Sequence, residues 1–432
     1  MLLLHLSDVH FRDGQAGLAL DPNRALRSAL VRDAEAQCAK IGATPDAILI
    51  SGDLTFAGSK AEFDFAQLWL EDLCKRCGTD PSNVFLVPGN HDVVRKIAGR
   101  PLVQAVHDQI KHANVATLEG LITGLLLDDE ASRLLYESLQ NYNEFSSRFF
   151  CSLVPPERTT ARRDLTLNDG SILRISGFNS TFVSSAGDAA GNLFIDASCF
   201  QLERERGVVH LAMCHHPFIW LRQGQALENF LNDTAHIQLF GHEHNNRIVV
   251  AKDFVRVYAS AAQPDRVEGE WEPGYNLIEL EVEGAGEDRH LSVKAHIRVW
   301  QKTPGTFRAK VTKDEVPVFK QTIRLDAWTP QPVNAAPALI GSDAAPLVAE
   351  SIETPNTPEE NEAMQTLREI SVRFFKLTLS QKAAIAGRLD LLEEADAKLP
   401  DYERYRSALL RAKARGLIEE LEKAVNEAAA KE

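Results

Sequence analysis

The chain has 432 residues, a formal net charge of -14 and six cysteines. This length suffices for one large domain or two to three ordinary ones, so a sizeable buried core is expected. The acidic balance disfavours a general affinity for nucleic-acid backbones or anionic membranes, since such binding requires a basic face, although a local basic groove stays open as an alternative. Cysteines without a regular framework indicate reduced thiols rather than a disulfide scaffold.

The first residues, Met1 to Asp8, have no basic lead and turn polar after a few apolar positions. Such a start is typical of neither a signal peptide nor a membrane anchor. Elsewhere no apolar run approaches the length of a membrane span. We therefore expect a cytoplasmic protein without a membrane partner.

Short apolar runs that end in polar clusters predict buried strands. In chain order they are Leu2 to Leu6, Ala47 to Ile50, Val84 to Val87, Ile172 to Ile175, Val208 to Met213 and Ile237 to Phe240. Helix-like stretches such as Arg24 to Ile41 and Glu62 to Cys74 lie between them. This alternation predicts a layered α/β domain with its functional residues at the C-terminal ends of the strands.

A Leu-rich segment at about residues 93–163 predicts a helical insert, which we expect to cap the site. More strands of the same domain are expected at residues 255–259, 276–282 and 291–299. The first domain is therefore predicted to span residues 1–325.

The composition then changes to Pro, Ala, Ser and Thr, which predicts a linker at residues 326–360. Residues 361–432 predict a small all-α domain, because apolar residues recur there with a helical period. The first of these helices is expected to follow the cap candidate Ser380 and to include Leu379, Ile385, Leu389 and Leu392. Two more are expected from Tyr402 to Ala412, before Gly416, and from Leu417 to Val425.

Polar motifs follow five of the predicted strands. They are Asp8-Val9-His10, Gly52-Asp53, Gly89-Asn90-His91-Asp92, Cys214-His215-His216-Pro217 and Gly241-His242-Glu243-His244. Residues two apart, such as Asp8 and His10, point to the same side of an extended segment. Each motif alone has an ordinary explanation as a turn or strand-end residue. Together they supply, from five strand ends, the nitrogen and oxygen ligands that suit Zn, Mn or Fe.

In this order the motifs resemble the calcineurin-like metallophosphoesterase superfamily, whose pattern is D-x-H, GD, GNH(D/E), H and GHxH, over roughly residues 1–300. The resemblance implies a four-layer αββα sandwich metallophosphoesterase with a site for two divalent ions, Mn, Fe or Zn, at one edge. It also implies the ligands: Asp8, His10 and His244 for one ion, Asn90, His215 and His242 for the other, and Asp53 between both. His215 is favoured over His216 because the family's ligand directly follows the strand.

The resemblance implies further that His91 contacts the phosphate and assists the leaving oxygen. Asp92 is expected to orient the ring of His91, with a plain turn acid as the alternative. A hydroxide between the two ions is the expected nucleophile. For His216, substrate contact and simple packing are both open.

The predicted activity is hydrolysis of a phosphodiester, and the D-x-H opening and the His-His-Pro segment look most like the cyclic-nucleotide phosphodiesterase branch of the superfamily. A phosphomonoesterase or a nuclease would use the same ligands, although the acidic balance disfavours long nucleic-acid substrates. From another class, the chain could be an interaction module whose phosphoesterase fold is a scaffold. The seven filled ligand positions argue against that alternative.

The C-terminal segments Leu377-Thr378-Leu379-Ser380, Leu389-Asp390-Leu391-Leu392 and Gly416-Leu417-Ile418 resemble effector-associated, death-like adaptor domains of bacterial signalling or defence proteins. This resemblance implies a protein partner. A plain helical bundle or dimerisation tail is the alternative, because helical periodicity does not distinguish between them.

Overall fold

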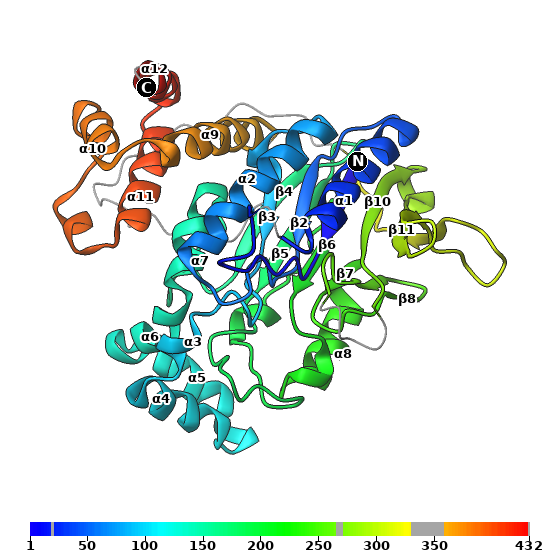
Figure 1. Cartoon of the computed structure of the whole chain (residues 1–432), viewed down its shortest axis with the longest axis horizontal. Coiled ribbons are helices and arrows are strands. Elements are labelled where there is room, and N and C mark those ends of the chain that lie inside the picture. Colours follow the sequence, from blue (N-terminus) through cyan, green and yellow to red (C-terminus); the bar gives the residue numbers. More distant parts are fainter. Residues whose placement is uncertain (19–20, 265–270, 330–357, 431–432) are drawn as a thin grey trace.

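The structure of the chain is a computed structural model that describes residues 1–18, 21–264, 271–329 and 358–430. Its central strands form two β-sheets, with helices around them (Figure 1). The expected αββα sandwich with an additional all-α region is therefore confirmed. Among the helices of the described residues, none combines the length and apolarity that crossing a membrane requires.

The first sheet has seven strands and is mixed. Six of them lie in the order β12 (Thr306–Ala309), β11 (His290–Gln301), β10 (Gly274–Glu283), β1 (Leu2–Leu6), β2 (Ala47–Ile50) and β3 (Val84–Leu86), and β13 (Phe319–Arg324) pairs with β11. The strands β1, β2 and β3 are parallel to one another, so their C-terminal ends lie at one edge.

The second sheet has six strands. Their order is β4 (Ala161–Thr166), β5 (Ile172–Phe178), β6 (Val208–Cys214), β7 (Ile237–Phe240), β9 (Val255–Tyr258) and β8 (Arg247–Val250). The four central strands from β5 to β9 are parallel, and they too end at a common edge.

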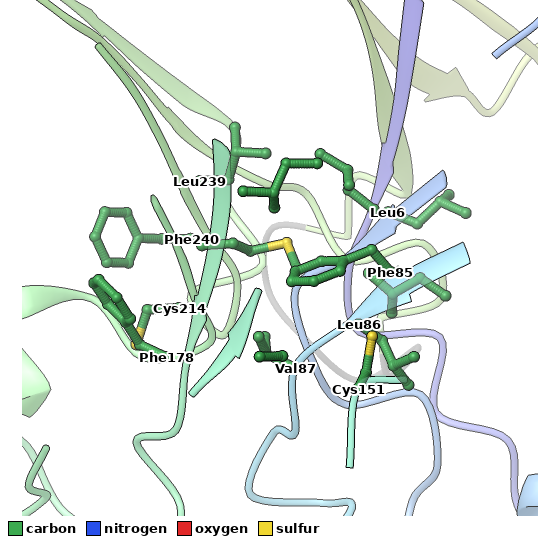
Figure 2. Close-up of a cluster of buried hydrophobic side chains, with 14 of the residues drawn as sticks. Leu6, Phe85, Leu86, Val87, Cys151, Phe178, Cys214, Leu239 and Phe240 are labelled. Carbon is green, nitrogen blue, oxygen red and sulfur yellow. The ribbon is translucent and has the colours of Figure 1, made fainter. Parts of the chain in front are cut away.

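The two sheets bury a shared apolar core, in which Leu6, Phe85, Val87, Phe178 and Leu239 lie close together (Figure 2). Gly177 shows how closely the sheets approach, because a Cβ added there would lie 2.6 Å from Cγ1 of Val87. The strands read as continuous apolar runs because they are covered on both faces.

Helix α1 (Arg24–Ile41) and helix α2 (Lys60–Cys77) pack on the first sheet. Asp33 of α1 accepts hydrogen bonds from Tyr275 of β10 and Arg298 of β11. Helix α2 starts at a capping box formed by Ser59 and Glu62. On the second sheet, α8 (Gly224–Thr234) is held by Arg256 of β9, whose guanidinium donates to Glu228 at 2.6 Å.

The segment between β3 and β4 is helical, as expected. It contains α3 (Arg95–Ala98), α4 (Pro101–Lys111), α5 (Leu118–Leu127), α6 (Asp129–Tyr136) and α7 (Gln140–Ser146). Strand β4 begins at Ala161, inside the segment predicted as insert. It was not predicted because Arg163 and Asp164 interrupt any apolar run there. Arg163 donates from Nη2 to the carbonyls of Val84 and Phe149, and Asp164 pairs with Arg174 at 3.0 Å.

The C-terminal region has four α-helices among its described residues: α9 (Pro358–Lys376), α10 (Leu379–Arg388), α11 (Asp401–Ala414) and α12 (Ile418–Ala429). Most of the predicted linker at 326–360 lies outside the described residues. Helix α9 was not predicted from the sequence, and the cap candidate Ser380 was wrong. Thr378 is the N-cap of α10, because its side chain accepts from the backbone of Gln381 and Gln381 accepts in return.

These C-terminal helices pack on the sandwich rather than standing apart (Figure 1). Gln365 of α9 donates to Ser82 and Asn83 at 3.0 and 2.9 Å. Phe150, at the end of the helical insert, is buried in the apolar core of the C-terminal helices. The two regions therefore share an interface.

Candidate metal centre

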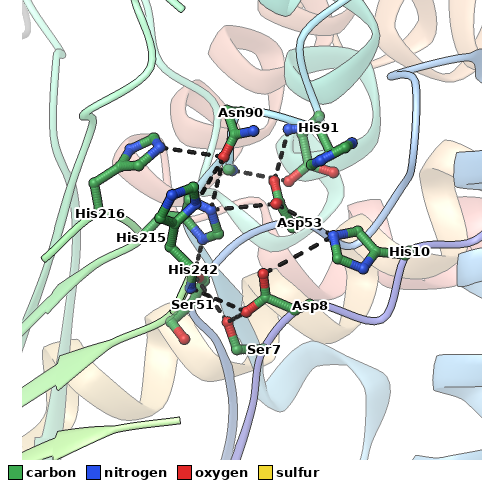
Figure 3. Close-up of polar contacts among 12 residues, drawn as sticks. Ser7, Asp8, His10, Ser51, Asp53, Asn90, His91, His215, His216 and His242 are labelled. Atoms are coloured by element: carbon green, nitrogen blue, oxygen red, sulfur yellow. Dashed lines mark hydrogen bonds and ion pairs between the residues drawn. The ribbon is translucent and has the colours of Figure 1, made fainter. Parts of the chain in front are cut away.

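The seven predicted ligands come together at the edge where the parallel strands of both sheets end. Figure 3 labels all of them except His244. Asp8 and His10 follow β1, Asp53 follows β2, Asn90 follows β3, His215 follows β6, and His242 and His244 follow β7. The edge of a parallel sheet at its strand C-termini is a common place for a binding site. The sandwich thus joins ligands from two sheets in one cluster.

One half of this cluster contains Asp8, His10 and His244. Nε2 of His244 lies 3.3 Å from Oδ1 of Asp8, and Nε2 of His10 lies 3.9 Å from the same oxygen. Asp8 is fully buried, and its other oxygen accepts from the Ser7 hydroxyl and, at 3.1 Å, from the backbone of His242. The carboxylate is thereby held with Oδ1 facing the two imidazoles.

The other half contains Asn90 and three histidines. Oδ1 of Asn90 lies 3.1 Å from Nε2 of His215, 3.1 Å from Nε2 of His216 and 3.1 Å from Nδ1 of His242. A neutral imidazole has a lone pair on one ring nitrogen, and an amide oxygen has lone pairs only. Four acceptor atoms that converge in this way form a donor set suited to a cation.

Asp53 lies between the two halves. Its Oδ2 is 3.3 Å from Nε2 of His10 and 3.3 Å from Nε2 of His215, and its Oδ1 accepts from the backbone of His91 at 2.7 Å. Potential ligand atoms lie within 4.8 Å of one another in each of four overlapping sets; three sets combine carboxylates and imidazoles, and one consists of three imidazoles. These residues fit divalent transition metals, which prefer this mixture of nitrogen and oxygen ligands.

The backbone of the site is strained. Asp8, His10, Asp53, His242 and His244 all have positive φ, between 52° and 70°. Residues other than glycine seldom adopt this left-handed conformation, and it concentrates at functional sites. The expectation that Asp8 and His10 belong to an extended segment was therefore wrong: β1 ends at Leu6, and the left-handed turns bring the two side chains together.

Glycines at three of the strand ends permit close approach to these side chains. A Cβ on Gly89 would lie 2.1 Å from Oδ1 of Asp53, and one on Gly52 would lie 2.5 Å from Nδ1 of His215. Gly241 has similar neighbours, with the Ser7 hydroxyl at 2.2 Å from its added Cβ. Gly52 also has a φ of +96°, which a side chain would disfavour.

Burial and charge act against each other in the cluster. Burial alone would raise the pKa of Asp53, but the neighbouring His215 and His10 hold that pKa well below its ordinary value. Burial would likewise lower the pKa of His215, yet the charge of Asp53 outweighs it and raises the pKa to about 9. For His242 burial prevails and, with the charge of His215, lowers its pKa to about 3. An ionised Asp53 is thus the electrostatic centre of the site.

His91 lies at the half-buried rim of the cluster. Its ring stacks on Phe56, with 5.0 Å between ring centroids, and its Nδ1 lies 2.7 Å from the carbonyl oxygen of Phe56. If Nδ1 donates to this carbonyl, the tautomer is fixed and Nε2 faces away from it. The ring of His10 is 4.8 Å away, which places His91 beside the ligands.

Asp92 does not orient His91, contrary to the expectation. Its fully buried carboxylate accepts from the backbone and hydroxyl of Thr55 at 2.9 and 2.8 Å and from the backbone of Gly89 at 2.9 Å. The carbonyl of Phe56 takes the orienting place instead. Asp92 ties the loop after β3 to the loop after β2, so it fixes the backbone that carries Asn90 and His91.

The structure also gives His216 a position in the cluster that the sequence analysis had left open. Its Nδ1 lies 2.8 Å from the Ser180 hydroxyl, and its Nε2 faces Asn90. Trp220 covers this side, since its ring lies 4.2 Å from that of His242 and 5.9 Å from that of His216. Trp220 was missed, because nothing in its sequence context distinguishes it from a core tryptophan.

The helical insert flanks the site instead of covering it as a separate cap. The backbone of Val94, just after the motif with His91, donates to Ser138 at 2.9 Å, and Asn179 donates to the Tyr136 hydroxyl at 3.2 Å. Tyr142 donates to the carbonyl of Leu86 at the end of β3. The insert therefore forms one wall beside the loop after β3.

Comparison with known proteins finds two family models in the chain. The model described as calcineurin-like phosphoesterase matches residues 1–246, and the model described as GTPase-associated adaptor domain matches residues 366–427. The first match includes all seven predicted ligands. The second covers the region that the sequence analysis likened to adaptor domains.

A curated relative is the metallophosphoesterase-like protein YydB of Bacillus subtilis (strain 168), which is 28% identical over 112 residues. The match covers 26% of this chain and only 21% of YydB, so the chain spans about a fifth of that relative.

Solved structures with a similar chain path include Vps29 of Chaetomium thermophilum and a putative 5′-nucleotidase of Staphylococcus aureus. Vps29 is 14% identical, with a TM-score of 0.29 over 75% of this chain and 98% of that one. The nucleotidase is 12% identical, with a TM-score of 0.38, and the match covers 73% of this chain and 56% of the nucleotidase chain.

Proposed function

Because the chain belongs to the calcineurin-like phosphoesterase family, we propose that it is a hydrolase that cleaves a phosphodiester with the help of two divalent metal ions. The observation that carries this proposal is the position of Asp53, 3.3 Å from His10 on one side and from His215 on the other. A single carboxylate between two groups of imidazoles is suited to bridge two cations, whose mutual repulsion requires an anion between them.

In this proposal Asp8, His10 and His244 hold one ion, and Asn90, His215 and His242 hold the other. Bound ions of this kind activate water and neutralise the charge of a phosphoryl group. The chain's own part is to fix these side chains by strained loops, by the glycine contacts and by hydrogen bonds of the ligands to Ser7 and Ser51. Manganese, iron and zinc all suit this ligand set.

His91 is proposed to donate a proton to the leaving oxygen from Nε2 of its imidazolium form, because its Nδ1–H is engaged by the carbonyl of Phe56; the ring is then left neutral. The stacked Phe56 ring holds the imidazole in place. Asp92 acts through the backbone: it positions the loop that carries His91 and does not touch the reacting atoms.

The test measures metal content and turnover together. The chain is purified, loaded with Mn²⁺, and assayed on bis(4-nitrophenyl) phosphate, 4-nitrophenyl phosphate, cyclic nucleotides and single-stranded DNA, with Asp53→Asn as the inactive comparison. We expect two metal ions per chain and turnover of at least one diester, with lower turnover of the monoester. A chain that binds two ions but cleaves none of these esters would contradict the proposal, and preference for the monoester or the DNA would assign it to another phosphoesterase class.

A second proposed function is recruitment of a partner through an adaptor domain at residues 361–432, beside a phosphoesterase domain at residues 1–325. It is supported by the match to the GTPase-associated adaptor model, which makes a GTPase the proposed partner. Leu379, at the start of α10, is a large apolar side chain with 58% of its surface exposed, so it is a suitable contact residue. Leu389 is less suitable, because it packs against the core of this domain.

The recruitment test compares the wild-type chain with Leu379→Asp in a pull-down, followed by identification of captured proteins by mass spectrometry. Capture of a GTPase by the wild type and its loss in the variant would support the proposal. Capture of the same GTPase by both chains would exclude Leu379 from the interface, and absence of any GTPase would contradict the assignment of the partner.

A further inference from the structure

Arg95, the first residue of α3, lies against the proposed acid His91. Its Nη2 is 3.1 Å from Nδ1 and 3.4 Å from Nε2 of His91. Since Nδ1 faces the Phe56 carbonyl at 2.7 Å and would donate to it, that nitrogen has no lone pair for Arg95. The neutral ring offers a lone pair at Nε2 alone, so His91 takes up at most one of the five N–H donors of the guanidinium.

The charge of Arg95 has little local compensation. Among the described residues, no carboxylate forms an ion pair with Arg95 within 4.0 Å. Asp188 is an acid whose pKa depends on the charge of Arg95. Burial raises the pKa of Asp188, and the charges of Lys111 and Arg95 both lower it. Asp188 already accepts from the backbone of Ser185 at 2.8 Å. One carboxylate shared by two cations leaves a positive excess at this rim.

The proposed metal site does not neutralise this excess. Two divalent ions would be balanced there by the carboxylates Asp8 and Asp53, a hydroxide and a monoanionic diester, so no negative charge is left over. The exposed guanidinium of Arg95 is therefore a positive charge beyond that balance, on the side of His91. Arginine presents its donors in a planar fork that suits carboxylate and phosphate groups.

We infer that Arg95 binds a second anionic group, carried by the part of the substrate that leaves. The anion is assigned to the leaving group because of the position of His91. In the proposed reaction His91 gives its proton to the leaving oxygen, and Arg95 lies next to His91 on the exposed side. This inference rests on the proposed phosphodiester hydrolysis. It narrows the substrate class to phosphodiesters whose leaving group itself carries a carboxylate or a phosphate.

A matched pair of substrates tests the inference on the Mn²⁺-loaded full chain. Methyl 4-nitrophenyl phosphate and methyl 3-carboxy-4-nitrophenyl phosphate differ by one carboxylate on the leaving group. We expect the carboxylated ester to have a kcat/KM about tenfold higher, the size of one exposed charge-assisted contact. In Arg95→Gln this ratio should fall to near one. Lys96→Gln, which removes the neighbouring exposed lysine, should keep the wild-type ratio.

Calorimetry gives a second readout that does not depend on turnover. The two phosphonates in which a methylene replaces the leaving oxygen are titrated into the same three proteins. The carboxylated phosphonate should bind about tenfold more tightly to the wild type and to Lys96→Gln, and equally to its partner in Arg95→Gln.

The outcomes separate the two hypotheses. Turnover of both esters with a ratio that is unchanged in Arg95→Gln would overturn the second-anion inference and leave the phosphodiesterase proposal intact. If neither ester is cleaved, the phosphodiesterase proposal fails for these diesters, and the calorimetric ratio alone decides whether Arg95 binds the anion.

Discussion

Nδ1 of His215 lies 2.8 Å from the backbone carbonyl oxygen of Ser51, and this contact turns Nε2 of the ring toward Asn90 and Asp53. His216 also directs its Nε2 at Asn90, but Asp53 contacts His215 and not His216.

We therefore expect His215→Ala to lower the metal content from two ions per chain to about one, measured by plasma mass spectrometry after dialysis. His216→Ala should retain both ions and lower kcat/KM about tenfold. Equal metal loss in both variants would make His216 a ligand.

Gly89→Ala is predicted to disable the site, because its Cβ would lie 2.1 Å from Oδ1 and 2.3 Å from the backbone nitrogen of Asp53. Neither the backbone nor the buried carboxylate of Asp53 can move aside as a flexible side chain could, so the crowding costs about 1–3 kcal/mol of stability. We expect the metal content to fall below one ion per chain and the midpoint of thermal unfolding to decrease. The matched control is Gly120→Ala in α5, where a Cβ meets nothing within 4 Å. This control should keep its metal and gain up to about 1 kcal/mol, since alanine favours helix.

His91→Gln is predicted to act on proton transfer and not on metal binding. A general acid matters most when the leaving group is a poor one, so the loss of kcat should be roughly 10²–10³ for an alkyl leaving group and under about tenfold for 4-nitrophenolate. Kinetics on two methyl phosphodiesters with these leaving groups provide the measurement, and the metal content should stay at two ions per chain. An equal loss for both leaving groups would assign His91 to binding or positioning.

The sequence sufficed for nine of the thirteen strands and for the ligand motifs because both depend on local patterns. Runs such as Ala47–Ile50 are buried on both faces, and polar residues that follow them directly must lie at the edge of the sheet. The family pattern then supplied the pairing of motifs across the two sheets. The activity and the ligand assignments remain proposals that the experiments above test.

What the sequence did not predict depends on contacts between distant segments. Asp92 looked like a partner for the adjacent His91, yet Thr55, 37 residues away, is its partner. The left-handed backbone of Asp8 and His10 follows from the neighbouring loops, since their amides donate to the carbonyls of Gly52 and Asp53. Strand β4 was not predicted because the contacts of its buried Arg163 and Asp164 are made by residues elsewhere in the fold.

His107 of α4 should make the chain sensitive to acid. It is fully buried, its two ring nitrogens have no hydrogen-bond partner among the described residues, and burial lowers its pKa to about 4. In the unfolded chain His107 is protonated below about pH 6.5, whereas in the folded chain it is protonated only below about pH 4. Stability from this residue is therefore complete above pH 6.5 and is lost as the pH falls toward 4.

His107→Leu should lower the pH dependence of the free energy of unfolding in this window by up to about 1.4 kcal/mol per pH unit, the value for one proton. Urea unfolding between pH 4.5 and 7.5 measures it. Since no hydrogen bond is lost, stability at pH 7.5 should be unchanged or higher. An unchanged slope would mean that His107 is protonated equally in both states.

The C-terminal helices should depend on Glu403 of α11 for their docking. This buried carboxylate accepts from Arg158 at 2.7 Å and from the Ser152 hydroxyl at 3.0 Å, next to the point where Phe150 enters their apolar core. Glu403→Leu leaves Arg158 without its counter-charge in a half-buried position, which should cost about 1–3 kcal/mol. Faster hydrogen exchange in α9 and α11 would report the weaker docking, with Glu419→Leu on the exposed side of α12 as the control. Because the proposed metal ligands lie on other elements, metal content should stay at the wild-type value. Exchange rates equal to those of the control would show that the apolar contact of Phe150 holds the helices without the ion pair.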